Sequence, residues 1–209
     1  MGTRLYYRPG TASMAPHAAL AEIGIDYELA RVETGTDGHV AESYRRVNPT
    51  GLVPTLIDGD LVLTESAAIL LHLAERYPEA HLLPPAGTDE RSEAYRWLMH
   101  LTNTVQTGFL RYFYPVRYGT EGVAETAAAE LATLFDRIEL RLADREWLAG
   151  DTRTVADLFL VMLIRWGRRL DPPAWDRPGL RDYAMRCYEI PGVRTMWVEQ
   201  ELDPPPFAA

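Results

Sequence analysis

Short apolar runs alternate with amphipathic stretches in the N-terminal part of the chain. Ile69 and Leu73 stand at helical spacing and predict a helix over 65–77. Asp58-Gly59 is a strong turn signal and predicts a hairpin between two short strands. The predicted elements are a strand at 4–7, a helix at 13–22, a strand at 27–32, a short helix at 40–46, strands at 55–57 and 61–63, and a helix at 65–77.

After residue 88 the pattern becomes helical. The segment 79–88 contains a Pro-Pro pair and Gly87, which predict a linker. Beyond it, helices are predicted at 89–114, 123–144, 154–169, 180–188 and 192–198. The sequence therefore predicts an α/β domain at 1–78 and an all-α domain, a helical bundle, at 89–209. The order of elements in the first domain matches a thioredoxin-like fold.

Composition narrows the class of protein. The chain has 209 residues and a net charge of −9, so it lacks the basic surface of a general nucleic-acid-binding protein. Every basic residue is Arg. The single Cys187 excludes an internal disulfide and a Cys-based zinc site, and no metal-binding motif occurs. No signal peptide is evident, and the longest nearly apolar run, 155–166, is too short to span a bilayer, so we expect a cytoplasmic protein.

A Val-Pro pair and a Glu-Ser pair flank the predicted hairpin. If Pro54 is cis, the backbone of Val53 turns outward and can pair with an extended ligand as an added strand. Glu65 and Ser66 open a helix, where free N–H groups and the helix dipole attract a carboxylate. The Ser66 hydroxyl can donate to that carboxylate, and Glu65 can hold an ammonium group. These positions suit a short peptide ligand.

This pattern resembles the glutathione site of the cytosolic glutathione transferases. The matching motifs, in order, are Pro-Gly-Thr-Ala-Ser at 9–13, Asn-Pro-x-Gly-x-Val-Pro at 48–54, Glu-Ser at 65–66 and Thr-x-x-Asp at 154–157. The segment 6–17 is similar to the bacterial beta class in particular, and the order of elements extends the resemblance over nearly the whole chain. The resemblance implies a homodimer that uses glutathione as a cosubstrate, without a metal or prosthetic group.

Such a site must hold the glutathione thiol as a thiolate. The free thiol has a pKa of about 8.5, and lowering it by about two units needs roughly 2.7 kcal/mol. A hydroxyl donor and a helix N-terminus can supply this together. The resemblance makes Ser13 and Thr11 the candidate catalytic hydroxyls, with Ser13 narrowly favoured and a plain N-cap as its alternative role. Beta-class members often have Cys where Ala12 stands, so Ala12 argues against a mixed disulfide.

Two further glutathione contacts follow from the resemblance. His39 stands near the position where some related classes have a histidine that binds the glycine carboxylate of glutathione. The alternative is an ordinary solvated loop histidine. Asn103 resembles a polar residue that reaches the glutathione of the partner subunit. The histidine expected slightly further on in the beta class falls near Val105, so that contact is missing.

The predicted helical domain supplies aromatic residues for a second-substrate pocket, because small-molecule pockets are mostly apolar. Tyr112 and Trp166 are the predicted lining residues, and helix packing is their alternative role. Thr154 and Asp157 predict a capping box at the start of a buried helix, which makes Asp157 structural rather than catalytic.

The predicted function is transfer of the glutathione thiolate to a small electrophile with an apolar body. Two alternatives stay open. One keeps the fold and changes the reaction to glutathione-dependent isomerisation, dehalogenation or peroxide reduction, since fold does not settle chemistry. The other is a non-catalytic protein that binds glutathione or another ligand on the same scaffold.

Overall fold

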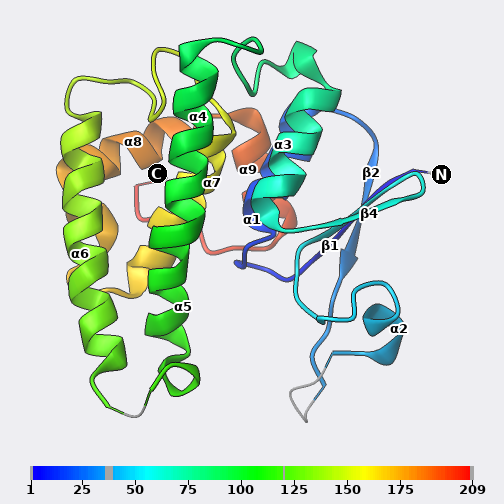
Figure 1. Ribbon diagram of the computed structural model, residues 1–209, viewed down its shortest axis with the longest axis horizontal. Coiled ribbons are helices and arrows are strands. Elements are labelled where there is room, and N and C mark those ends of the chain that lie inside the picture. Colours follow the sequence, from blue (N-terminus) through cyan, green and yellow to red (C-terminus); the bar gives the residue numbers. More distant parts are fainter. Residues whose placement is uncertain (1, 36–39, 120, 208–209) are drawn as a thin grey trace. The chain divides into compact units, whose positions relative to one another are not determined.

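A computed structural model describes residues 2–35, 40–119 and 121–207. The chain forms two compact units, and most of their helices and strands are labelled in Figure 1. The first unit comprises 1–80 and 189–204, and the second comprises 81–188 and 205–209. Within the described ranges, no helix has the length and apolar character needed to cross a membrane.

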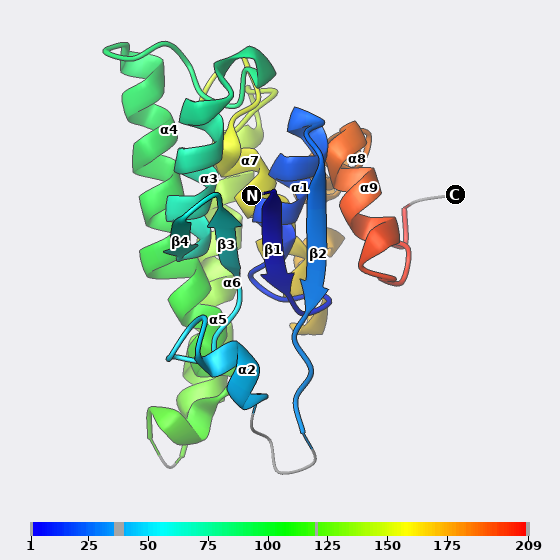
Figure 2. The same cartoon turned by 90° about the vertical axis from the view of Figure 1, so that its right-hand side faces the viewer.

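The first unit is built on a four-stranded sheet in the order β2-β1-β3-β4, seen side by side in Figure 2. The strands are β1 (Thr3–Tyr7), β2 (Tyr27–Arg31), β3 (Thr55–Asp58) and β4 (Leu61–Thr64). β1 runs parallel to β2 and antiparallel to β3, which pairs antiparallel with β4. Leu5 pairs with Leu56, and both side chains are fully buried. The predicted strands, the hairpin and the thioredoxin-like fold are confirmed.

The first unit has four α-helices within its described residues. They are α1 (Met14–Ile23), α2 (Glu42–Arg45), α3 (Ser66–Arg76) and α9 (Pro191–Glu199). α3 buries the apolar face that its sequence spacing predicts, including Ile69 and Leu73. α1 packs against both α3 and α9.

The close approach of α9 to α1 depends on Gly192. A Cβ atom at this position would lie 2.4 Å from the carbonyl oxygen of Ala18 and 2.5 Å from the amide nitrogen of Glu22. The Gly192 N–H donates to the Glu22 carboxylate at 2.8 Å. Residues 189–204 thereby belong to the first unit, although the sequence-based division at 79–88 assigns them to the helical domain.

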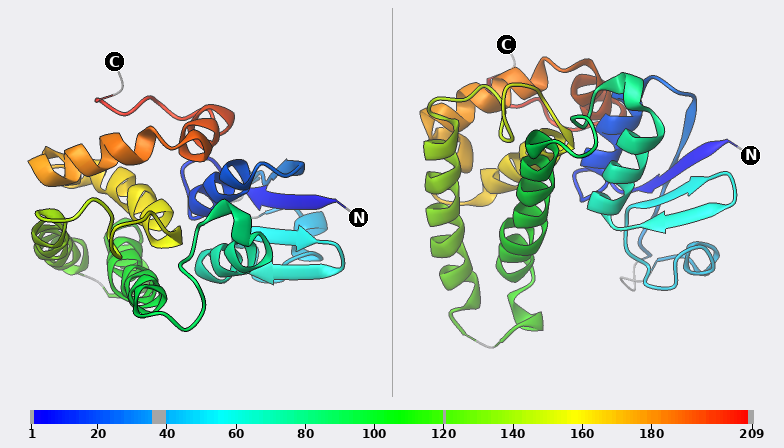
Figure 3. Two further views of the ribbon diagram at one scale, coloured as in Figure 1. Left: turned by 90° about the horizontal axis from the view of Figure 1, so that it is seen from above. Right: turned by 45° about the horizontal axis from the view of Figure 1, so that its top comes forward.

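The second unit is entirely helical among its described residues, and Figure 3 gives two further views of its helices. The helices are α4 (Asp89–His100), α5 (Thr107–Phe113), α6 (Val123–Leu142), α7 (Val155–Trp166) and α8 (Pro178–Tyr188). Every residue of α7 is buried, as expected of a helix that is apolar on nearly all sides. The predicted all-α character of this part of the chain is confirmed.

The continuous helix predicted at 89–114 is interrupted. A π-helical turn, Leu101–Gln106, separates α4 from α5. Thr102 and Thr107 donate their hydroxyls to the backbone carbonyls of Leu98 and Asn103, both at 2.7 Å. Threonine hydroxyls that bond to preceding carbonyls compete with the regular helical ladder, which gives a local reason for the irregular turn.

Asp157 holds the start of α7 to the preceding loop. Its carboxylate accepts from the Thr154 amide at 2.6 Å and the Leu148 amide at 2.9 Å. The Tyr183 hydroxyl of α8 donates to it as well, at 2.6 Å. Burial raises the pKa of Asp157, and these donors oppose the rise because they favour the carboxylate. The predicted capping box is present, and Asp157 is structural.

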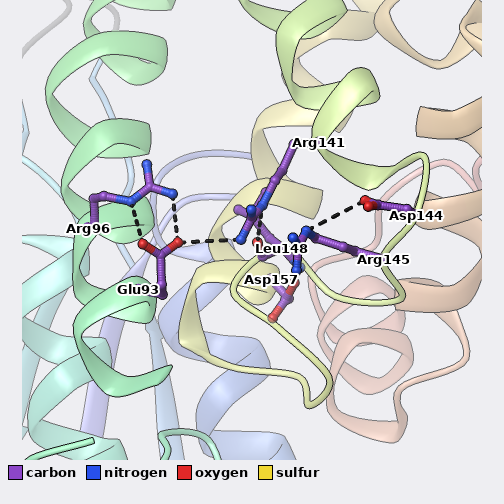
Figure 4. Close-up of polar contacts among 7 residues, drawn as sticks. All are labelled: Glu93, Arg96, Arg141, Asp144, Arg145, Leu148 and Asp157. Atoms are coloured by element: carbon purple, nitrogen blue, oxygen red, sulfur yellow. Dashed lines mark hydrogen bonds and ion pairs between the residues drawn. The ribbon is translucent and has the colours of Figure 1, made fainter. Parts of the chain in front are cut away.

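A charged cluster joins the same loop to α4 and α6, as Figure 4 shows. Arg96 binds both carboxylate oxygens of Glu93, at 3.0 and 2.7 Å. Arg141 reaches Glu93 at 3.4 Å and also donates to the backbone carbonyl of Leu148 at 3.2 Å. Arg141 therefore connects the surface ion pair to the residue whose amide binds Asp157.

Candidate active site

The loop between β1 and α1 carries both candidate hydroxyls. The backbone carbonyl of Arg8 accepts from Thr11 Oγ1 at 2.8 Å and from Ser13 Oγ at 3.0 Å. The two hydroxyl oxygens are themselves 3.0 Å apart. Ser13 has no exposed surface, whereas Thr11 is half-buried. Thr11 is therefore the more accessible hydroxyl of the pair.

Ser13 does not cap α1 through its side chain. It occupies the N-cap position, yet its hydroxyl makes no bond to a helix N–H. The hydroxyl points back to the Arg8 carbonyl instead. The alternative role as a side-chain cap is thus not realised in this structure.

The start of α3 is bonded directly to this loop. Ser66 Oγ donates to the carbonyl of Ala12 at 2.9 Å, and Ser66 is buried. In this structure the Ser66 hydroxyl proton is therefore used within the protein, whereas the sequence predicts that it donates to a ligand carboxylate. The backbone N–H groups of the first helical turn have no intrahelical partner and are the donors that α3 offers to an anion.

Glu65 precedes α3 with an unusual backbone. Its φ of 68° lies in the left-handed region, which a non-glycine residue adopts only where its surroundings enforce it. The side chain is exposed. Strained residues of this kind cluster at binding sites, which is consistent with the predicted ligand role of Glu65.

Two residues without a predicted role, Tyr44 and Asn48, fix the segment before β3. The peptide bond between Val53 and Pro54 is cis. Just before it, the carbonyl of Leu52 accepts from the Tyr44 hydroxyl and from Asn48 Nδ2, the latter at 2.8 Å. Asn48 was visible as part of the Asn-Pro motif, but Tyr44 gave no comparable signal. Since Thr55 pairs with Tyr6 of β1, this segment lies beside the end of β1.

A polar network, buried at His17 and Gln200, ties the loop between β1 and α1 to the end of α9. Gln200 accepts from the Gly10 amide at 3.0 Å, and its Nε2 lies 3.1 Å from His17 Nδ1. His17 Nε2 lies 2.8 Å from the Glu199 carboxylate, which also accepts from the Tyr27 hydroxyl at 2.9 Å. Because the Gln200 amide nitrogen only donates, Nδ1 must accept and the His17 proton resides on Nε2.

His17 has no exposed surface. Burial lowers its pKa, and the Glu199 carboxylate opposes this change. The neutral ring is the form that the network accommodates, because a second proton on Nδ1 would face the Gln200 amide hydrogens. No local sequence pattern announced this network, since its partners are far apart along the chain.

Three other predicted residues belong to the second unit. Asn103 is exposed on the π-helical turn. Tyr112 is half-buried and donates its hydroxyl to the carbonyl of Arg169 at 2.6 Å. Trp166 is buried, with ring centroids 5.8 Å from Phe109 and 6.0 Å from Phe113. Helix packing therefore accounts for most of the Trp166 surface. His39 lies outside the described residues.

The chain matches two family models. Residues 1–75 match the glutathione S-transferase N-terminal domain, and residues 100–191 match the glutathione S-transferase C-terminal domain. Glutathione S-transferase GstA of Escherichia coli O157:H7 is 33% identical over 171 residues, which cover 78% of this chain and 81% of that protein. The chain belongs to the glutathione S-transferase family.

Solved structures of glutathione S-transferases share its fold. A glutathione transferase from Methylococcus capsulatus is 34% identical, with a TM-score of 0.86 over 95% of this chain and 98% of that one. A beta-class enzyme from Sphingomonas chungbukensis is 29% identical, with a TM-score of 0.85 over 96% of this chain and 100% of that one. A sphingomonad enzyme complexed with glutathione is 30% identical, with a TM-score of 0.84 over 96% and 100% of the two chains. The resemblance inferred from the motifs is confirmed.

This glutathione S-transferase has Ala12 between its two candidate hydroxyls, so residue 12 supplies only a backbone carbonyl, to Ser66. Cys187 is buried in α8, and burial raises the pKa of its thiol, which makes it an inert packing residue. Across the described residues, no group of three or more His, Cys, Asp or Glu side chains is placed to hold a metal ion.

Proposed function

We propose that this glutathione S-transferase conjugates the thiolate of bound glutathione to small electrophiles that have an apolar body. The observation that carries the proposal is the bond from Ser66 to the Ala12 carbonyl, which joins the start of α3 to the loop with both hydroxyls. The anion-binding helix start and the thiol-activating groups thereby lie at one end of the sheet of the first unit.

Each predicted residue has a role in binding glutathione or the electrophile. The backbone of Val53, before Pro54, pairs with the extended glutathione chain. The first-turn amides of α3, beginning at Ser66, bind the carboxylate of its glutamyl group, and Glu65 holds the neighbouring ammonium. His39 and Asn103 stay predicted contacts, the latter to glutathione in a partner subunit. Tyr112 and Trp166 stay predicted pocket residues for the electrophile.

We assign the thiolate contact to Thr11, with Ser13 in support. Thr11 is the accessible hydroxyl, and it can turn its proton from the Arg8 carbonyl to the thiolate. Ser13 Oγ, 3.0 Å away, can then donate to Thr11 Oγ1. A hydrogen bond to a charged group contributes about 1.5–3 kcal/mol and a helix N-terminus about 0.3–1 kcal/mol. Their sum matches the roughly 2.7 kcal/mol that a two-unit fall in pKa requires.

The chemical step needs only the two substrates. The thiol proton leaves to solvent, the sulfur lone pair forms the new carbon–sulfur bond, and the leaving group departs with its bonding electrons. The protein supplies proximity and stabilisation of the sulfur anion. Turnover of 1-chloro-2,4-dinitrobenzene with glutathione tests the proposal, because both chloride release and the conjugate absorbance can be followed.

One observation favours a second candidate, a binding protein without turnover. Both hydroxyls are within hydrogen-bond distance of the Arg8 carbonyl, and Ser13 is fully buried. If these bonds persist in the complex, no hydroxyl is left for the thiolate. Bound glutathione would then keep the thiol pKa of the free peptide.

The assembly and location of the protein are proposals as well. We propose a homodimer in the cytoplasm, on the resemblance to the cytosolic members of the family. Its partners are then glutathione, an electrophile and a second copy of the chain.

A further inference from the structure

Arg8 contacts both candidate hydroxyls through its carbonyl, and its guanidinium has a nitrogen, Nε, without a hydrogen bond among the described residues. It follows β1 directly, and its carbonyl is the acceptor shared by Thr11 and Ser13. Its side chain reaches Thr34, beyond the end of β2, where Nη1 donates to Thr34 Oγ1 at 3.1 Å. One residue therefore has its carbonyl on the candidate thiol-activating hydroxyls and its guanidinium beside Thr34.

The Nε atom of this guanidinium has no hydrogen-bond partner among the residues that the structure describes. Arg8 Nε is buried and makes no hydrogen bond. Arg4 and Arg31, also in the first unit, each have a carboxylate partner, with Arg4 2.7 Å from Glu28 and Arg31 2.8 Å from Glu33. Buried polar groups are normally hydrogen-bonded, and a buried charged donor without a partner is costly. This donor is therefore available to a partner outside the described residues.

The geometry of the side chain indicates what that partner is. Nη1 is engaged by Thr34, which leaves the edge formed by Nε and Nη2. Two parallel N–H groups on one edge of a guanidinium match the two oxygens of a carboxylate. Neither a neutral amide nor a hydroxyl offers two acceptors at this spacing.

We propose that Arg8 binds a substrate carboxylate beside the thiol site and so makes the enzyme selective for that group; this rests on the proposed function. The carboxylate has two possible sources, the glycyl end of glutathione or an acid group on the electrophile. Arg8 is connected to the candidate thiol site through its own carbonyl, which accepts from both hydroxyls.

Equilibrium binding of two ligand pairs tests the proposal and separates the sources. The first pair is glutathione and its glycyl ethyl ester. The second is S-(4-carboxy-2-nitrophenyl)glutathione and the corresponding carboxamide. Dissociation constants are measured by calorimetry for the parent, Arg8→Gln, Arg8→Lys and Arg31→Gln. Arg31→Gln is the matched control, because it removes the same charge from a nearby arginine that already has a carboxylate partner.

We expect Arg8→Gln to weaken the ligand with the recognised carboxylate by about ten- to a hundredfold and its blocked counterpart by less than about twofold. A selective loss for glutathione over its ester identifies the glycyl carboxylate. A selective loss for the acid conjugate over the amide identifies the electrophile. Arg8→Lys should recover part of the selectivity, since it keeps the charge and loses the paired donors.

Equal weakening of charged and blocked ligands, or no change in any of them, would overturn the role of Arg8. Circular dichroism and the thermal midpoint establish that each variant is folded, and Arg8→Lys carries the test if Arg8→Gln is not. The readout needs no turnover. A parent that binds these ligands but conjugates nothing refutes the proposed transferase activity and leaves the Arg8 result standing. A parent that binds none of them refutes both.

Discussion

Asp157 has no exposed surface, and its carboxylate is the common acceptor for groups from the loop before α7 and from α8. Replacing it with Ala would leave the buried amides of Leu148 and Thr154 and the Tyr183 hydroxyl without this partner. Each unsatisfied buried donor costs about 1–3 kcal/mol. We therefore expect Asp157→Ala to lower the free energy of unfolding by about 3 kcal/mol or more.

Urea denaturation of Asp157→Ala checks this expectation against Asp151→Ala. Asp151 is exposed in the same loop, so its replacement should change the unfolding free energy by less than about 0.5 kcal/mol. Equal effects at the two positions would contradict the role of Asp157 as a buried acceptor.

His17 gives the stability of the protein a dependence on pH. Its pKa is lowered in the folded state by burial, whereas the unfolded chain has a histidine pKa of about 6.5. Below that pH the unfolded state binds the additional proton, so protonation favours unfolding. The contribution of neutral His17 is complete above about 6.5 and is lost as the pH falls below it.

We expect the unfolding free energy of the parent to fall more steeply below about pH 6.5 than that of His17→Gln. Urea denaturation at several pH values measures both slopes. Burial also lowers the pKa of His100, but His100 is present in both proteins and cancels in the comparison. Parallel slopes would show that His17 does not titrate between the two states.

At the scale of elements, α9 packs closely against α1 because Gly192 has no side chain. A methyl group there would approach the backbone of α1 to 2.4 Å, and backbone cannot yield as a flexible side chain does. We expect Gly192→Ala to destabilise the protein by about 3 kcal/mol. Gly150→Ala is the control, since nothing lies within 4 Å of its added Cβ. Similar thermal midpoints for the two variants would contradict the close packing.

Elements whose signals are local were predictable from the sequence. The hairpin at Asp58-Gly59 and the capping box of Thr154 and Asp157 depend on residues a few positions apart. The π-helical turn was not predictable, because apolar spacing alone does not distinguish it from a regular helix. The docking of α9 was missed for a different reason: the cue at Gly192 becomes visible only when Ala18 and Glu22 are known to lie opposite.

The candidate site likewise has features that local motifs predicted and features that depend on contacts between distant parts of the chain. The motifs predicted where Ser66 and Pro54 would lie, because each is tied to a turn or a helix start. They did not predict that Ser66 would bond to Ala12, or that Gln200 would hold the Gly10 amide, since these contacts join distant parts of the chain. The preference for Ser13 over Thr11 also rested on the motif alone, and burial now favours Thr11 as the accessible group.

For the whole molecule, the proposed homodimer sets a simple mass expectation. The chain has a mass of 23.6 kDa, so light scattering should give twice that value at micromolar concentrations. The mass should not depend on glutathione. A mass of a single chain across the accessible concentration range would contradict the dimer.

The central claim is that the first unit lowers the pKa of a bound thiol, and the absorbance of bound glutathione thiolate against pH tests it most directly. For the parent we expect a thiol pKa about two units below the free value of about 8.5. Thr11→Ala should raise it by about one unit or more, and Ser13→Ala by less, because a lost charge-assisted hydrogen bond is worth about 1.5–3 kcal/mol. Tight binding with an unshifted thiol in all three proteins would contradict the account and leave a glutathione-binding protein without thiol activation.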